Sequence, residues 1–504
     1  METKRRRRES YVSSSTLDPS LSLSSPAAGD VDRLTQLPDV LRLYILSLLP
    51  LKFAIRTSVL SSKWRGIWRF RWPQPSFINI FPSPSLPHPE FVSLVDDFFR
   101  RRGFARIDCL QIMYSPSALQ IPDIKRWLSY AASCSVCEFY LDLSLKASSP
   151  NKTRRRGARA AAAAAAPILD FNFRSPTLNH LTLRGFHLSA SPPSFRMLLF
   201  HLEILNLWEI CLSSASLRRI LANCPALRSL SIRRCQDLKK VAIPVSAIRL
   251  TSLTVVDCRK VSAISVLALG LRSFRFSGDL LKTYFIQSPA MLEDVYISSG
   301  TAVPSVSSGD WVKPFGALAS LKVLTLCSIT LECIADLSAH AEVGFHLFPN
   351  LVELQLLMTM MADSNLSDIY GFFKYCPCPR LEKLFLELPM STCDPSMSTF
   401  LLVPTEEPPK VGFSSLKFVK MNGFKGHLNE MLLAGVLLMK SGNLEHFAVV
   451  APRGNNGEKC ETSTANFLQC LSTKLSLLPK ASAKASIILT ENDTSQFRPV
   501  HSEV

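Results

Sequence analysis

Hydrophobic residues recur along most of the chain in a six-residue pattern, L-x-x-L-x-L, in which other aliphatic or aromatic residues replace some of the leucines. Clear copies begin at positions 178, 202, 227, 250, 271, 292, 321, 351, 381, 416 and 444. Leucine-rich repeats have a period of about 20 to 29 residues, so the later, wider steps indicate insertions. An ordinary α/β domain with leucine-rich strands would not explain the period. The pattern therefore predicts an α/β fold: a leucine-rich-repeat solenoid whose strands stack into a parallel β-sheet horseshoe.

Two weaker copies of the pattern, beginning at 107 and 136, extend the array towards the N-terminus. The step from 136 to 178 is unusually long, and it coincides with a segment rich in Arg and Ala at residues 146–167. We interpret this segment as a low-complexity insertion between two repeats.

The two-residue period of a β-strand decides which side chains of each repeat face outward. Positions 1, 4 and 6 of the pattern point into the core, and positions 3, 5 and 7 point to the concave surface. We therefore expect Leu205, Val295 and Leu384 to be core residues. Larger outward side chains are candidates for contacting a target protein, because aromatic and Arg side chains often anchor interfaces; for any one of them, an incidental surface position is the alternative. These candidates, whose aromatic members we expect to be solvent-exposed, are Trp208, Arg233, Arg275, Tyr296, Lys383 and Phe385.

A separate helical pattern occupies residues 31–73. Pro38 suits the first turn of a helix, and Leu41, Ile45 and Leu48 follow at the spacing of one helix face. Two further short apolar segments complete a unit of three helices. A unit of about 40 residues is too small to bury all these apolar side chains, so we expect a partner surface to complete its core.

The stretch "DRLTQLPDVLRLYILSLLPLKFAIRTSVLSSKWRGIWR" resembles an F-box of the plant type. The rest of the chain is similar to the leucine-rich half of the same proteins, and "LKFVKMNGFKGHLNEMLLAGVLLMKSGNLEHFAVV" resembles their FBD-type segment. The resemblance implies a substrate-recognition adaptor of a Skp-cullin-F-box ubiquitin ligase, which docks on a Skp-type adaptor protein and through it on a cullin. The target protein is not identified by the sequence. The docking residues that the family motif implies are Leu37, Pro38, Leu41, Ile45, Leu49, Val59, Trp64 and Trp68.

These patterns and the resemblance together predict the organisation of the chain. It consists of a disordered, basic and Ser-rich tail at 1–30, the F-box at 31–73, a helical connection at 74–104, the solenoid at 105–411, FBD-like repeats at 412–490 and a tail at 491–504.

The formal net charge of +17 raises the alternative of a nucleic-acid partner. Nearly all of this charge lies in three short segments, residues 1–10, 32–72 and 146–159, so we expect no long basic face for a phosphate backbone. A nucleic-acid partner is therefore not expected. The alternative that stays open is a nuclear scaffold without ligase activity, in which the run Lys4–Arg8 acts in import or binds nucleic acid.

We expect neither a catalytic residue nor a bound cofactor or metal. The sequence lacks the phosphate-binding loop and the common hydrolase motifs. The cysteine pairs Cys134 with Cys137 and Cys376 with Cys378 lack the second pair that structural zinc needs, so we interpret them as core thiols. No apolar run approaches the length that spans a bilayer, and no secretory signal is recognised, so we expect the nucleus, the cytoplasm or both.

Overall fold

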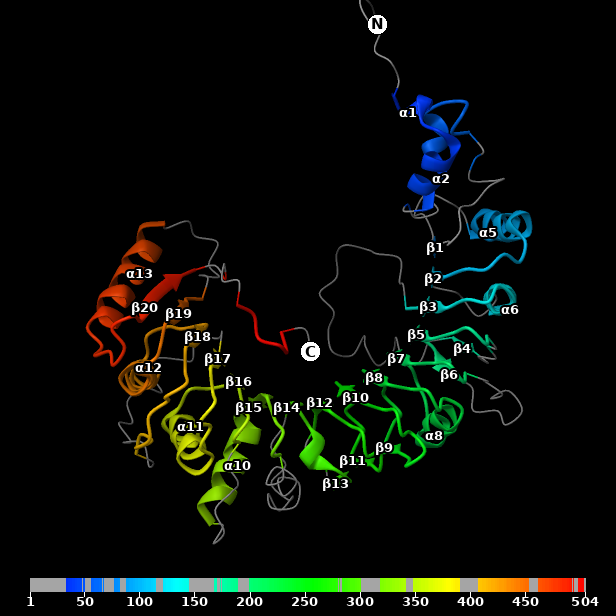
Figure 1. Ribbon diagram of the computed structural model, residues 1–504. Helices are drawn as coiled ribbons and strands as arrows, with labels where there is room; N and C mark the ends of the chain where they lie inside the picture. The colour runs from blue at the N-terminus through cyan, green and yellow to red at the C-terminus, as the bar shows by residue number, and fades with distance from the viewer. Residues whose placement is uncertain are drawn as a thin grey trace, which may run out of the picture.

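The computed structural model describes residues 33–47, 49, 56–65, 67, 77–81, 88–114, 121–144, 167–169, 173, 175–188, 199–279, 281, 283–300, 318–340, 348–389, 407–452, 461–491, 493 and 497–502. The predicted tail at 1–30 and nearly all of the predicted insertion lie outside these residues. The described chain forms a curved solenoid, with the N-terminal helical module beyond its first strand (Figure 1).

One sheet of 15 strands follows the inner curve of the solenoid, and its strands lie side by side in chain order. Every pairing in this sheet is parallel. The strands are β1 (Phe77–Ile80), β2 (Cys109–Met113), β3 (Glu138–Asp142), β5 (His180–Arg184), β7 (Ile204–Trp208), β8 (Ser229–Arg233), β10 (Ser252–Val256), β12 (Ser273–Gly278), β14 (Asp294–Ser299), β15 (Val323–Cys327), β16 (Glu353–Leu357), β17 (Lys383–Glu387), β18 (Phe418–Asn422), β19 (His446–Val450) and β20 (Ser486–Thr490). The predicted parallel solenoid is confirmed.

Each copy of the leucine pattern contains one of these strands, which begins at the third residue of the pattern. The copy at 202 gives β7, and the copy at 444 gives β19. Equivalent positions pair across the sheet, so that Leu205 lies opposite Leu230. Leu205, Val295 and Leu384 are each 1% exposed, which confirms their predicted core positions. Full burial of one such side chain contributes about 1.5 to 3 kcal/mol to folding.

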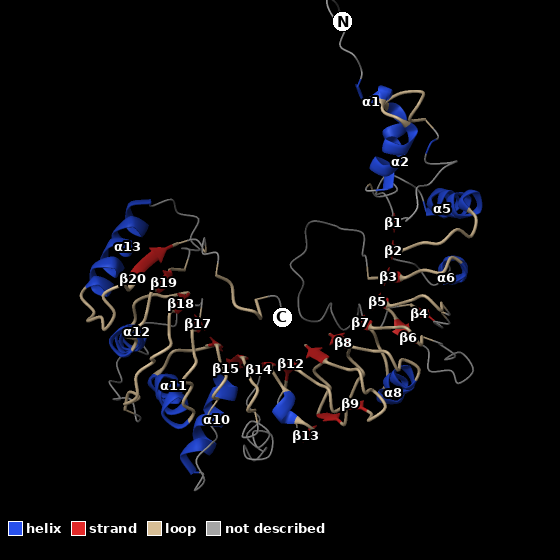
Figure 2. Ribbon diagram, in the orientation of Figure 1, coloured by secondary structure: helices blue, strands red, loops and turns tan. Residues whose placement is uncertain are grey.

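The return segments on the outer side differ with the length of the repeat (Figure 2). Where the leucine patterns begin only 21 to 23 residues apart, the return is a short strand, and these strands form a second parallel sheet. Where the patterns begin 28 to 30 residues apart, the helices α10, α11 and α12 fit, each of 13 residues. The outer elements are α5 (His88–Arg102), α6 (Ile121–Ser133), β4 (Ile168–Leu169), β6 (His187–Leu188), α8 (Ser214–Ala222), β9 (Lys240–Ile243), β11 (Ala263–Val266), β13 (Thr283–Ile286), η3 (Pro289–Met291), α10 (Ser328–His340), α11 (Asp363–Tyr375), α12 (Leu428–Lys440) and α13 (Glu461–Ser476).

The solenoid begins earlier than the predicted boundary at residue 105. Within the predicted connection 74–104, β1 pairs in parallel with β2, and Ile78 lies opposite Leu110. Helix α5 buries four apolar side chains in the continuous core of the repeats. The connection is therefore a first repeat unit, which the leucine pattern missed because "FINI" contains no leucine.

The predicted FBD-like region, 412–490, continues the same architecture. Strands β18, β19 and β20 extend the sheet, and α12 and α13 lie on its outer side (Figure 1). Within the described residues, the helices are all too short or too polar to cross a bilayer.

Tight turns in the left-handed backbone region follow several strands. Glu209, Arg234 and Asp257 have φ near 55°, and each comes directly after the last residue of its strand. Such values are uncommon for residues other than glycine. The turn directs the next side chain inward, and Cys235 and Cys258 are 0% and 1% exposed at that position.

Candidate protein-interaction surfaces

The N-terminal module is a small helical unit with a minimal core. Its described helices are α1 (Arg33–Gln36), α2 (Asp39–Ser47) and η1 (Thr57–Val59). Among the module's described residues, Leu46 and Trp64 are the only buried apolar side chains. The indole Nε1 of Trp64 donates a hydrogen bond to the carbonyl oxygen of Leu34 at 3.2 Å. A core of this size contributes little stability by itself.

A buried arginine ties α2 to the segment that carries Trp64. The guanidinium of Arg42 donates to the carbonyl oxygen of Lys63 at 2.9 Å and forms an ion pair with Asp39. Arg42 is 6% exposed, whereas the side chain of Asp39 is 60% exposed, so the ion pair is open to water on the side of the carboxylate. The module is thus fixed as much by polar contacts as by its core.

Six apolar or aromatic side chains of the module are exposed to solvent. Val59 is the most exposed, at 86% of its surface. Scattered exposed apolar residues are normal, but six of them on so short a unit make this part of the module a candidate interaction surface. We call this set the module face; it consists of Leu34, Val40, Leu41, Tyr44, Val59 and Leu60.

The structure divides the eight predicted docking residues into three groups. Pro38, Leu41 and Val59 are exposed. The half-buried residues, which pack against Leu46 and Trp64, are Leu37, Ile45 and Leu49. Trp64 is 1% exposed and therefore supports the module face from within, while Trp68 lies outside the described residues. The docking role of the set stays a prediction.

On the concave surface, Trp208 lies between two arginines from the neighbouring strands. The guanidinium carbons of Arg184 and Arg233 are 5.7 and 5.8 Å from the centre of the Trp208 ring. Cations at this distance are attracted to the face of an aromatic ring. Trp208 and Arg233 are half-buried, so both keep part of their surface available for a partner.

The predicted exposure of Tyr296 and Phe385 was wrong, although their outward direction was right. Tyr296 is 8% exposed and Phe385 2% exposed. Phe385 packs against Phe418, with ring centres 5.6 Å apart, in a small cluster separate from the main core. Tyr296 is contacted by the ring of His501 near the C-terminus, with centres 5.5 Å apart. Neighbours on the concave surface therefore cover both rings.

The two remaining candidates, Arg275 and Lys383, are half-buried and engaged in ion pairs. Arg275 donates to the carboxylate of Asp294 at 2.6 Å, and the ammonium of Lys383 is 3.7 Å from a carboxylate oxygen of Glu353. Both cations are thus held against carboxylates of the same surface.

Charged side chains are buried on the concave surface of β14 to β18. Glu353 is 4% exposed and Lys420 3% exposed. Burial favours a higher pKa for Asp294, but hydrogen bonds from His501 and Arg275 outweigh it and lower that pKa below its usual value. Buried charges are costly unless they are paired. The leucine pattern carries no signal for these residues, because it identifies outward positions without indicating whether they are covered.

The last described residues, 497–502, lie on this half of the concave surface, and we call them the C-terminal segment. In Figure 1 they form the red trace on the inner side of the curve, next to the C label. His501 is 4% exposed there. The sequence predicts only a tail at 491–504; its one signal for a contact with the repeats is the presence of Phe497 and Val500 among polar residues.

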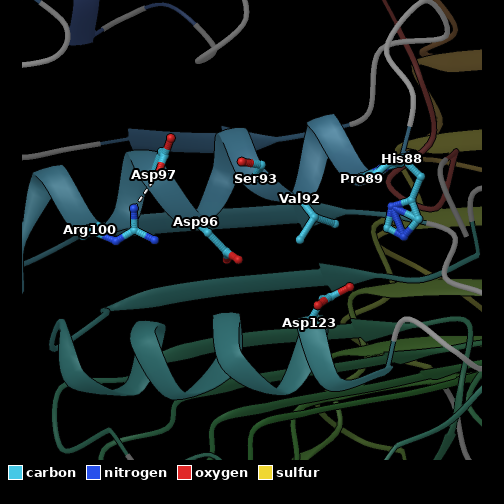
Figure 3. A pocket seen from close by; sticks show the side chains of 8 residues that line it. All are labelled: His88, Pro89, Val92, Ser93, Asp96, Asp97, Arg100 and Asp123. Carbon is cyan, nitrogen blue, oxygen red and sulfur yellow. Dashed lines mark hydrogen bonds and ion pairs between the residues drawn. The ribbon is translucent and has the colours of Figure 1, made fainter.

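A surface hollow between α5 and α6 contains three carboxylates (Figure 3). Asp96 accepts hydrogen bonds from Arg126 at 2.6 Å and from Trp127 Nε1 at 2.9 Å. Asp97 is paired with Arg100, and Asp123 with Arg126. Each carboxylate therefore already has an arginine partner, Arg126 being shared by Asp96 and Asp123, and we assign the hollow no ligand.

One group of potential metal ligands occurs among the described residues. Ligand atoms of His187, Cys211 and Asp237 all lie within 4.8 Å of one another. Structural zinc sites have four protein ligands, and here Asp237 already pairs with Lys260 at 3.0 Å. The Lys260 ammonium is already paired with the Asp237 carboxylate that a metal would need, so we do not assign a metal site.

The two cysteine pairs that were considered as metal ligands are free thiols in the repeats. Cys134 and Cys376 are buried, and Cys137 and Cys378 are half-buried. Burial raises the pKa of Cys378 well above its ordinary value, which makes this thiol a poor nucleophile.

Comparison with known proteins finds matches for both the N-terminal module and the repeats. The F-box domain family model matches residues 34–72, and the At1g61320/AtMIF1 LRR domain model matches residues 107–491. The chain is 27% identical over 451 residues to F-box/FBD/LRR-repeat protein At1g78750 of Arabidopsis thaliana, which covers 82% of this chain and 88% of that protein. It is 30% identical over 225 residues to F-box/LRR-repeat protein 25 of the same plant. The matched region covers 44% of this chain and 76% of that protein. Because one match coincides with the helical module and the other extends over most of the chain, this protein belongs to the plant-type F-box/LRR-repeat family.

Proposed function

We propose that this protein is a substrate-recognition adaptor of a Skp-cullin-F-box ubiquitin ligase. The F-box docks on a Skp-type adaptor and through it on a cullin, and the repeats bind a target protein. The observation that carries the proposal is the module face, which exposes six apolar side chains over a core of two. Such a surface is expected of a subunit that folds against a permanent partner.

The mechanism that follows is proximity, with no chemical step performed by this chain. Holding a lysine of the target near a conjugating enzyme that carries ubiquitin turns a bimolecular encounter into a nearly intramolecular one. A rigid solenoid suits this task, because its continuous core fixes the target surface relative to the first repeat. The pair formed by Trp208 and Arg233 is the part of that surface that we expect a target to contact first.

The proposal is tested by co-purification of the full chain with a plant Skp-type adaptor. We expect Val59→Glu to abolish co-purification, because the change places a charge on the most exposed side chain of the module face. The matched control is Ile248→Glu, which places the same charge on an apolar residue of the repeats that is 71% exposed. The control should bind normally. Equal recovery of the adaptor with both variants would contradict docking through this face.

A further inference from the structure

We propose that the concave surface of β14 to β19 is a groove for a peptide segment that carries an aromatic residue and, four positions later, a histidine that lies in a turn. The C-terminal segment occupies this groove as an internal ligand, and a target has to displace it. The inference rests on the proposed function, since it names the class of target segment that the repeats recognise.

The histidine site of the groove is built from adjacent strands. Nδ1 of His501 lies 2.7 Å from the hydroxyl of Thr325, and Nε2 contacts the carboxylate of Asp294. The ring also meets Tyr296 edge-on, at an interplanar angle of 81°. A phenylalanine of similar shape would lose the hydrogen bonds of both ring nitrogens, so that Asp294 and Thr325 would each have one partner fewer. The site therefore selects histidine.

The aromatic site lies three strands away, on β18. The ring of Phe497 packs on Phe418 with centres 4.6 Å apart. Phe418 belongs to the small aromatic cluster of the concave surface, which also contains Phe385. The rings of this cluster point outward and are separate from the main core. In this proposal they form the floor of a site for one further aromatic side chain.

Between these two sites the groove binds the backbone of the segment. The amide of Val500 donates to the carboxylate of Glu353 at 2.7 Å, and the carbonyl oxygen of Phe497 accepts from the ammonium of Lys420 at 3.4 Å. Backbone contacts of this kind give affinity that does not depend on the peptide's side chains, while side-chain pockets give specificity. The pattern of contacts is thus that of a peptide complex.

The segment can leave without unpairing the carboxylates of the groove, while the buried ammonium of Lys420 loses the Phe497 carbonyl oxygen and depends on Asp493 at 2.7 Å. Asp294 keeps its ion pair with Arg275, and Glu353 keeps its contact with Lys383. The side chains of Phe497 and Val500 are about half exposed even when bound, at 46% and 52%. Departure of the segment therefore uncovers a groove whose carboxylates stay paired, which is the arrangement that an exchangeable ligand requires.

The test uses a fluorescent peptide with the sequence of residues 491–504 and the full chain in two forms. One is the native chain, and the other carries Phe497→Ala together with His501→Ala, so that its own segment no longer fills the groove. We expect saturable binding to the double variant and at least tenfold weaker binding to the native chain, measured by fluorescence anisotropy. A tethered segment competes at an effective concentration on the order of millimolar.

Two controls fix the interpretation. A peptide whose histidine is replaced by phenylalanine should lose at least tenfold in affinity, and so should the native peptide when the double variant also carries Thr325→Val. A second measurement on the native chain is hydrogen exchange of the Val500 amide, which we expect to be slowed by its bond to Glu353. Equal binding of the peptide to both forms of the chain, or an unprotected Val500 amide, would overturn the inference. Adaptor co-purification depends on the F-box alone, so failure of the proposed function would be seen separately.

Discussion

Gly185, directly after β5, occupies a turn in which both backbone conformation and space exclude a side chain. Its φ is 82°, and a Cβ atom there would lie 2.5 Å from the backbone nitrogen of Ser144. Gly103 has a similar φ of 66°, but a Cβ atom would meet nothing within 4 Å. The two glycines therefore separate conformational strain from steric overlap.

We expect Gly103→Ala to lower the free energy of unfolding by about 1 kcal/mol through backbone strain alone. Gly185→Ala should lower it by clearly more, because the chain near Ser144 has to move as well. Urea denaturation of both full-length variants measures the difference. If the two variants unfold at the same midpoint, Ser144 shifts freely and the turn is not constrained by packing.

At the scale of one strand, β7 contains two aliphatic neighbours with opposite environments. Leu205 is 1% exposed and faces the core, whereas Ile204 is 36% exposed on the concave surface. We expect Leu205→Ala to lower the free energy of unfolding by about 2 to 5 kcal/mol, through lost burial and a residual cavity. Ile204→Ala removes a side chain of the same size and should cost under about 1 kcal/mol.

Thermal denaturation of the two full-length variants measures this contrast. A larger loss from Ile204→Ala would place the strand one residue out of register, because a shift by one exchanges the two faces of a sheet.

The strands were predictable from sequence because a repeated core position leaves a periodic trace of leucines. Every copy of the pattern from 107 to 444 became a strand at its third residue. The first strand, β1, was missed because its inward residues are Ile78 and Ile80 in a segment without the leucine spacing. A periodic pattern identifies only repeats that resemble one another. A terminal repeat differs from the rest, so the pattern does not identify it.

For side chains on the concave surface, the direction in which they point was predictable from sequence, but their exposure to solvent was not. Residue direction follows from the strand period alone, and this placed Tyr296 and Phe385 on the correct side. Exposure depends on what else packs there, and the contact between His501 and Asp294 joins positions 207 residues apart. A contact of that range leaves no trace in a local pattern, so the coverage of the surface became visible only in the structure.

At the scale of the whole molecule, the formal net charge of +17 makes the salt dependence of binding the property that distinguishes the proposed adaptor from a nucleic-acid-associated scaffold. Binding to the Skp-type adaptor through the apolar module face should change less than about threefold between 50 and 500 mM salt. Contacts with phosphates would weaken by several orders of magnitude over a comparable range. Titration of the full chain with adaptor and with duplex DNA, each at several salt concentrations, makes the comparison; tight binding to DNA that falls steeply with salt would favour the scaffold.

The order of the groove strands and their ligand along the chain has a consequence for synthesis. A polypeptide is synthesised from its N-terminus, so the strands that hold Asp294 and Thr325 leave the ribosome long before His501, which contacts them. Until His501 emerges, the nascent protein carries these strands without their internal ligand. During that interval the groove is open to other peptides or to chaperones without competition from the C-terminal segment.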